Sequence, residues 1–229
     1  MLRLDGVEIV LGGFALRADF EVPTGAKVAL IGPSGAGKST LLLAIAGFLA
    51  PRVGRVLWDG RDLAALTPAQ RPVSMLFQDQ NLFPHLTIAQ NLGLALAPNL
   101  RLSPAQTTQV EAVLDRLGLA GLGNRRPAAL SGGQMGRAAL GRALLQNRPV
   151  LLLDEPFAAL GPGLKADLLA LVAEVAQDAT VLMVTHDPAD ARRFADLAVL
   201  VADGVAQAPV ATEALFADPP PALRAYLGV

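Results

Sequence analysis

The sequence predicts an α/β fold in which helices cover a mostly parallel sheet, and three observations support this prediction. Short, almost wholly apolar runs recur at residues 28–31, 73–77, 150–153, 181–184 and 197–201. Strands buried on both faces of a parallel sheet have this composition. Helical patterns follow the first, second and third of these runs. The length of 229 residues and the 52% apolar content suit one large core better than two independent domains.

An antiparallel accessory sheet is expected near the amino terminus. The first residues look strand-like, and residues 55–58 run directly into Asp59 and Gly60. An Asp-Gly pair between strand-like runs favours a tight hairpin. A second pair, Asp203 and Gly204, follows the last apolar run and predicts another turn between strands.

Between the second and third apolar runs the pattern turns helical. Ser103 and Gln106 have the spacing of a capping box, and Pro104 suits the first turn of the helix. Ser131 begins a second helical pattern. The chain is therefore expected to form one domain, residues 1–229, with an α/β core at residues 1–77 and 148–229 and an inserted α-helical subdomain at residues 78–147.

A glycine-rich loop is the most informative stretch, and it lies between the first apolar run and a helical pattern that extends from Lys38 to about residue 49. It consists of Gly32, Pro33, Ser34, Gly35, Ala36, Gly37, Lys38, Ser39 and Thr40. Glycines let backbone N–H groups curl around phosphate oxygens, Lys38 reaches the β- and γ-phosphates, and Ser39 ligates Mg²⁺. The loop predicts a P-loop NTPase fold and a bound nucleoside triphosphate with Mg²⁺.

Two carboxylates follow the third apolar run. Asp154 and Glu155 would lie at the carboxyl-terminal edge of a central strand, where open α/β sheets bind ligands. Asp154 suits Mg²⁺ coordination, and Glu155 is placed to polarise an attacking water. Beside a phosphate loop, this pair indicates hydrolysis of the nucleotide.

Composition excludes several other classes of protein. A formal net charge of −1 and three lysines leave no basic stripe for nucleic acid. Mean hydropathy is high at +0.44, yet the longest apolar run, residues 41–50, is too short to span a bilayer. No cysteine is present for a disulfide or a thiolate metal site, and the start of the chain does not look like a signal peptide. A cytosolic location is expected.

The run Leu130-Ser131-Gly132-Gly133-Gln134 places free N–H groups at a helix start, which suits a phosphate but also suits an ordinary N-cap. The other motifs of the chain decide between these interpretations. This run, the phosphate loop, Gln78, the Asp154-Glu155 pair and His186 follow one another in the order and spacing of the ATP-binding cassette family. The chain resembles that family over nearly its whole length.

The resemblance implies a RecA-like parallel core and a homodimer that closes on ATP. The run at residues 130–134 would be the family's signature. Two chains would sandwich two ATP molecules head to tail, so that the γ-phosphate held by Lys38 of one chain meets the signature run of the other. The signature residues in that contact would be Ser131, Gly132, Gly133 and Gln134. The resemblance also implies that Gln78 senses Mg²⁺ and the γ-phosphate, Glu155 activates water, and His186 contacts the γ-phosphate and the neighbouring chain.

Within the family, residues 71–78 and 81–93 look most like the ATPase subunits of bacterial thiamine importers. This likeness implies uptake of thiamine or its phosphates through a transmembrane permease that contacts residues 79–86. A periplasmic solute-binding protein would take part indirectly, and the chain would lie at the cytoplasmic face of the inner membrane, held there by the permease. Importers of iron, sulfate or spermidine remain alternatives, as does a regulatory nucleotide-binding module with weakened hydrolysis.

Three positions depart from the family pattern. Leu11 stands where relatives place an aromatic residue against adenine, although Phe14 lies close by. Gly161 replaces the usual aspartate of a loop that crosses the dimer, and Met135 follows the signature where relatives commonly have arginine. These departures predict slower turnover of ATP.

Overall fold

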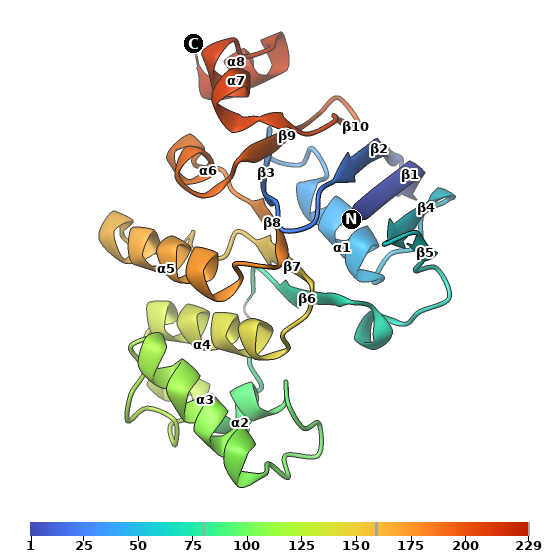
Figure 1. The fold of residues 1–229 in the computed structure, drawn as a ribbon. Helices are drawn as coiled ribbons and strands as arrows, with labels where there is room; N and C mark the ends of the chain where they lie inside the picture. Colours follow the sequence, from blue (N-terminus) through green and yellow to red (C-terminus); the bar gives the residue numbers. More distant parts are fainter. Residues whose placement is uncertain (80, 159, 229) are drawn as a thin grey trace.

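Five parallel strands form the centre of the molecule in the computed structural model, which describes residues 1–79, 81–158 and 160–228. Their order across the sheet is β9 (Leu197–Ala202), β3 (Lys27–Ile31), β8 (Thr180–Val184), β7 (Val150–Asp154) and β6 (Val73–Leu76). Each coincides, within one residue at either end, with an apolar run, so the predicted parallel sheet is confirmed. Figure 1 shows these strands between the helices.

Side chains of the central strands alternate between two hydrophobic clusters. On β7, Leu151 and Leu153 belong to the cluster that includes Leu140, Leu168 and Leu223, whereas Val150 and Leu152 belong to the cluster that includes Leu41 and Ile45. Successive residues of a strand point to opposite faces of its sheet, so a strand covered on both sides must be apolar throughout. That requirement explains the uninterrupted apolar runs of the sequence.

The amino-terminal strands form the predicted antiparallel sheet. They are β1 (Leu2–Leu11), β2 (Phe14–Val22), β4 (Val53–Trp58) and β5 (Arg61–Asp62). Asp59 and Gly60 join β4 to β5 with positive φ angles of 47° and 77°, as a tight hairpin requires. The short β10 (Val205–Ala206) pairs with both β2 and β9 and so links the two sheets, and β11 (Val210–Ala211) pairs with β9.

Helix α1 (Lys38–Ala46) lies between the antiparallel strands and the parallel core (Figure 1). The sequence predicts a helix to about residue 49, but α1 ends at Gly47, whose φ of 89° closes it in the left-handed region. The buried guanidinium of Arg71 donates to the carbonyl oxygens of Ala44 and Ile45 at 3.0 and 2.8 Å. The bond to Ile45 satisfies a carbonyl near the helix end, and the bond to Ala44 adds a second donor to a carbonyl that also accepts from the N–H of Gly47.

Three helices pack together in the lower part of Figure 1, between β6 and β7 in the chain. They are α2 (Ile88–Gly93), α3 (Pro104–Arg116) and α4 (Gly132–Leu145). Capping boxes begin all three, at Thr87, Ser103 and Ser131, each with glutamine three residues later. Gly141 of α4 leaves room for Leu117, since a Cβ there would lie 2.7 Å from its Cδ1.

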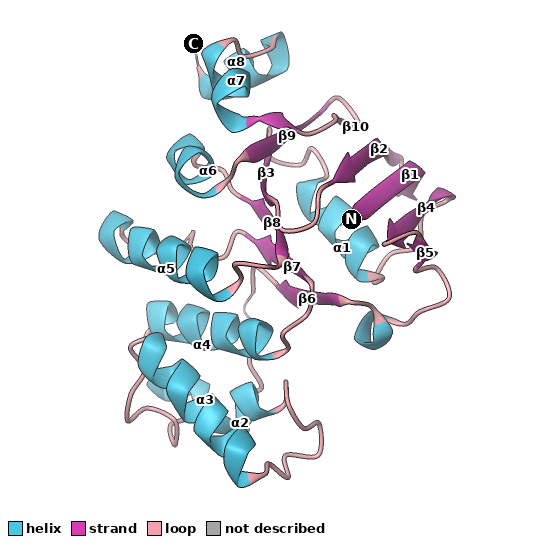
Figure 2. Ribbon diagram, in the orientation of Figure 1, coloured by secondary structure: helices cyan, strands magenta, loops and turns pink. Residues whose placement is uncertain are grey.

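The remaining helices follow β7, as Figure 2 shows in cyan: α5 (Pro162–Val175), α6 (Pro188–Phe194), α7 (Thr212–Ala217) and α8 (Pro221–Leu227). Single 3₁₀ turns occur at Pro68–Gln70 and Pro127–Ala129. The proline-rich end of the sequence suggests only a short tail, but Leu223 of α8 is completely buried. Among the described residues, no helix has the length and apolar character needed to cross a bilayer.

Candidate functional site

Four of the predicted site segments leave the same edge of the sheet. The phosphate loop follows β3, His186 follows β8, Asp154 ends β7, and Gln78 follows β6. Because β3, β8, β7 and β6 are consecutive parallel neighbours, their carboxyl ends lie side by side. Residues separated by more than a hundred positions are thus brought to one edge.

Two glycines of the phosphate loop are required by close approach. Gly32 has a φ of 143°, and a Cβ there would lie 2.0 Å from the carbonyl oxygen of Val201 on β9. Gly37 has a φ of 100°, and its Cβ would lie 2.6 Å from Cζ of Phe14. The loop therefore turns tightly between β9 and the antiparallel sheet, and the helix that follows begins with its N–H groups facing the loop.

Lys38 and Ser39 connect this loop to its surroundings. The ammonium group of Lys38 donates to the carbonyl oxygens of Gly32 and Pro33, both at 2.8 Å. Burial lowers the pKa of Lys38, while the nearby carboxylates of Glu155 and Asp154 act in the opposite direction. Ser39 Oγ donates to Asp154 Oδ1 at 2.9 Å, which joins the start of α1 to the end of β7.

Asp154 is 6% exposed, and its burial raises the pKa of its carboxyl group. The carboxylate of Glu155 raises this pKa further, whereas the hydrogen bond from Ser39 and the charge of Lys38 lower it. A hydroxyl and a carboxylate side by side are oxygen ligands of the kind that Mg²⁺ prefers. The described residues contain no group of three or more acidic, histidine or cysteine side chains that would enclose a metal alone. Such a pair fits an Mg²⁺ ion that shares its coordination with phosphates and water.

Glu155 and His186 face each other across neighbouring strand ends, with His186 Nδ1 3.4 Å from Glu155 Oε2. Glu155 has a φ of 45°, which is uncommon for a side chain of its size, and its N–H donates to the carbonyl oxygen of Val184. Strained backbone of this kind concentrates at functional sites. Both side chains reach solvent, as groups that act on a bound ligand must.

The signature residues occupy a different part of the molecule. Ser131 is the N-cap of α4, where its Oγ accepts a hydrogen bond from the N–H of Gln134, and Gly132 and Gly133 form the first turn. Helix α4 packs against the parallel sheet on the face opposite α1. No contact between Ser131 and the phosphate loop is found within the three described ranges, so a single chain does not bring these two predicted phosphate sites together.

The departures from the family pattern have distinct surroundings. Leu11 is exposed at the end of β1, whereas Phe14 packs against the phosphate loop at Gly37. Met135 is partly buried against the larger hydrophobic cluster. Gly161 is the N-cap of α5 and supplies no side-chain cap. Gln80, in the segment expected to contact the permease, and Ala159, two residues before Gly161, lie outside the described residues.

An ion-pair cluster beside the site was not anticipated from the sequence. Lys165 of α5 lies 3.1 Å from Asp187 Oδ2 and 3.0 Å from Asp190 Oδ2. The Thr185 hydroxyl donates to Asp190 and accepts from the N–H of Asp187. The cluster fixes the loop that carries His186. Asp187 before Pro188 is recognisable as a helix start, but the sequence contains no signal that pairs it with Lys165.

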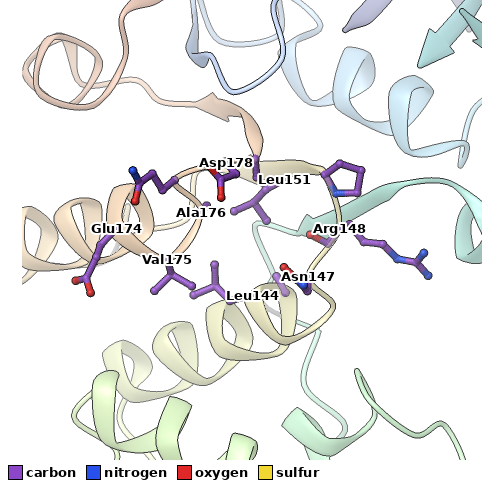
Figure 3. Close-up of a pocket in the computed structure, with 13 residues that line it drawn as sticks. Leu144, Asn147, Arg148, Leu151, Glu174, Val175, Ala176 and Asp178 are labelled. Carbon is purple, nitrogen blue, oxygen red and sulfur yellow. The ribbon is translucent and has the colours of Figure 1, made fainter. Parts of the chain in front are cut away.

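Two hollows lie away from this edge. One of about 400 Å³ opens at the amino-terminal ends of β6 and β7, where Glu174 and Arg148 stand at opposite ends with Leu144 and Val175 between them (Figure 3). It contains none of the predicted site residues. The other, of about 450 Å³, lies between the end of α1 and the segment after α2, and is lined by Phe48 and Phe77.

Comparisons with known proteins agree with this geometry. A family model described as ABC transporter matches residues 16–158. A protein of Cereibacter sphaeroides named thiamine import ATP-binding protein ThiQ is 66% identical over the whole of both chains, and one of the same name from a Ruegeria species is 57% identical over the whole of both chains.

Solved structures of similar fold include a nucleotide-free ATP-binding cassette, with a TM-score of 0.86 and 28% identity over 100% of this chain and 99% of that one. Another is a dimeric cassette in a post-hydrolysis state bound to ADP and Pi, with a TM-score of 0.83 and 29% identity over 93% of this chain and 99% of that one.

We expect Asp154→Asn to raise the free energy of unfolding at pH 7 by about 0.5–2 kcal/mol, because the ionised carboxylate is buried. A carboxyl whose pKa is raised by folding stabilises the fold while protonated, and this contribution is lost as pH rises through the folded-state pKa. The gain from asparagine should therefore shrink as the pH falls toward 4. Urea unfolding at both pH values measures it.

Asp167→Asn, an exposed change on α5, is the matched control and should alter stability little at either pH. A gain in the Asp154→Asn variant that is equal at pH 4 and pH 7 would contradict the explanation from burial.

Proposed function

Since the chain belongs to the ABC transporter family, we propose that it is the ATP-hydrolysing subunit of a bacterial thiamine importer. Family membership makes it an ATP-binding ATPase. The solute is inferred from the relatives of 66% and 57% identity, both named for thiamine import. Importers of iron, sulfate or spermidine are the competing class, and they share the same nucleotide chemistry.

The juxtaposition of Lys38, Ser39, Asp154 and Glu155 at one sheet edge carries the ATPase part of the proposal. In it, Lys38 releases the loop carbonyls and binds the β- and γ-phosphates. Ser39, Asp154 and Gln78 hold Mg²⁺, which neutralises phosphate charge when bound. Glu155 orients a water toward the γ-phosphate, and His186 contacts that phosphate from the neighbouring strand end.

We propose that the working unit is a head-to-tail homodimer. The separation of Ser131 from the phosphate loop within one chain supports this arrangement, since the exposed start of α4 then needs a phosphate held by another copy. A structure of similar fold is a dimer with ADP and Pi. In the closed pair, Ser131, Gly132, Gly133 and Gln134 meet the γ-phosphate that the partner's loop holds.

A transmembrane permease is the proposed partner at the surface around Phe48, Phe77 and Phe83. The hollow of about 450 Å³ is lined by mostly apolar residues, with Gln146 and Arg148 among them. Phe48, which lines it, is 52% exposed and meets Phe77 edge to face, with the ring centres 5.3 Å apart. Phe83, within the segment expected to contact the permease, is 45% exposed. Apolar surface of this kind is typical of protein interfaces. Docking there would hold the chain at the cytoplasmic face of the inner membrane, with a periplasmic solute-binding protein acting through the permease.

Glu155→Gln is expected to accumulate an ATP-bound dimer, because the pair can still close around ATP and Mg²⁺ but water is no longer activated. Sedimentation velocity of the variant with and without nucleotide measures this. Glu111→Gln, an exposed change on α3, should behave like the wild type. Monomers alone at saturating ATP and Mg²⁺ would count against the head-to-tail arrangement.

The solute is tested in vesicles that contain the chain and its permease. Thiamine presented with the periplasmic binding protein is expected to stimulate ATP hydrolysis and to accumulate inside, and Glu155→Gln should abolish both effects. Stimulation by spermidine, sulfate or iron in place of thiamine would refute the solute while leaving the ATPase assignment intact.

Gly161→Asp is expected to increase ATP turnover in the presence of the permease by about threefold, less than about 1 kcal/mol of activation free energy. The substitution fits, because the backbone of Gly161 is extended and a Cβ there meets nothing within 4 Å. Gly161→Asn caps α5 equally well without the charge, so it should turn over ATP at the wild-type rate. Equal rates for the wild type and Gly161→Asp would remove Gly161 as a cause of slow turnover.

A further inference from the structure

The single tyrosine of the chain contacts the site from the far end of the sequence. Tyr226, in the last turn of α8, donates its hydroxyl to the carbonyl oxygen of His186 at 2.6 Å. Forty residues separate the two. Neither residue type nor spacing marks this pair in the sequence, and no step of the proposed hydrolysis uses Tyr226.

Helix α8 is held firmly enough to position what it touches. Leu223 is completely buried, and Tyr226 and Leu227 pack against the larger hydrophobic cluster. The preceding helix α7 is joined to α6 through the Arg192 guanidinium, which lies 4.6 Å from the centre of the Phe216 ring. Figure 1 shows α7 and α8 together at the end of the molecule next to α6 and β9.

The His186 side chain depends on its backbone for its direction. Its imidazole is 57% exposed, and its Nδ1 lies 3.4 Å from Glu155 Oε2. Thr185 is tied to β3 through its N–H and the carbonyl oxygen of Leu30, and Asp187 is tied to Lys165. Between these two anchors, the peptide that follows His186 is held by Tyr226.

We propose that Tyr226 is a positioning residue for ATP hydrolysis: by fixing the His186 carbonyl, its hydroxyl keeps the imidazole directed toward Glu155 and the reacting phosphate. This inference rests on the role proposed above for His186. Burial raises the pKa of Tyr226, and the nearby carboxylates of Glu155 and Asp187 raise it further. The phenol therefore stays protonated and able to donate across the pH range in which the ATPase is assayed.

The test compares the full chain with Tyr226→Phe, which keeps the ring and removes the donor. The variant should lower kcat for ATP hydrolysis by about fivefold, the factor expected of one neutral hydrogen bond, and leave KM for ATP unchanged. Loss of the same bond should lower the Tm by only about 2–4 °C, so the chain stays folded at the assay temperature. The matched control is Thr212→Val at the start of α7, since the Thr212 hydroxyl is buried without a partner among the described residues. That variant should keep wild-type kcat.

A double variant with His186→Ala and the restoration of a donor at position 226 distinguish a positioning role of Tyr226 from a general loss of stability. Added to His186→Ala, the Tyr226→Phe change should cause no further loss, because its effect passes through His186. Replacing Tyr226 with 4-aminophenylalanine, which restores an N–H donor, should recover kcat, and 4-methoxyphenylalanine should not. An unchanged kcat in Tyr226→Phe, or an equal fivefold loss in the His186→Ala background, would overturn the inference.

Variants of His186 and Glu155 test the proposed function separately from the role of Tyr226. If His186→Ala and Glu155→Gln lose activity while Tyr226→Phe retains it, only the role of Tyr226 is wrong. If His186→Ala hydrolyses ATP at the wild-type rate, the proposed role of His186 fails, and the inference built on it fails too.

Discussion

Parallel pairing of β3, β8, β7 and β6 is the constraint on which the site depends. Because these strands run in one direction, whatever follows each of them emerges at the same edge. The hydrogen bond from Ser39 to Asp154 then fixes the phosphate loop against β7. A register shift of one residue in β7 would turn Asp154 from the edge toward a core face and would also reverse the alternation of Leu151 and Leu152 between the two hydrophobic clusters. Packing of the core and placement of the carboxylates are therefore enforced together.

The site concentrates features that cost the fold free energy. Lys38 and Asp154 are charged groups in a buried setting, and Glu155 holds a left-handed backbone conformation. The chain offsets these costs with rigid supports at the same edge: the carbonyls of Gly32 and Pro33 around Lys38, and the Lys165 ion pairs below His186. Once Lys38 has exchanged these carbonyls for phosphate oxygens, charges held in this way would stabilise a reacting phosphate without reorganising when the reaction occurs.

Local chemistry explains why much of the fold was predictable. Uninterrupted apolar runs marked the parallel strands, capping boxes at Ser103 and Ser131 marked helix starts, and Asp59-Gly60 marked a hairpin. The unpredicted parts depend on contacts between distant residues. Prolines near residues 218–221 obscured α7 and α8, whose stability comes from Leu223 in the core rather than from propensity. The pairs Lys165–Asp190 and Tyr226–His186 join separate helices and loops, and residue types alone do not determine which side chains meet.

The buried charges of Lys38 and Asp154 also connect the lifetime of the protein in the cell to the binding of its ligand. A nucleotide with its cation would bring further counter-charges to Lys38 and Asp154, in addition to those that these two residues and Glu155 already provide for one another. A ligand that binds only the folded form shifts the folding equilibrium by mass action, and in cells unfolded molecules are removed by proteases. The amount of this subunit in a cell should consequently follow its supply of nucleotide: where nucleotide is scarce, more of the chain would unfold and be degraded.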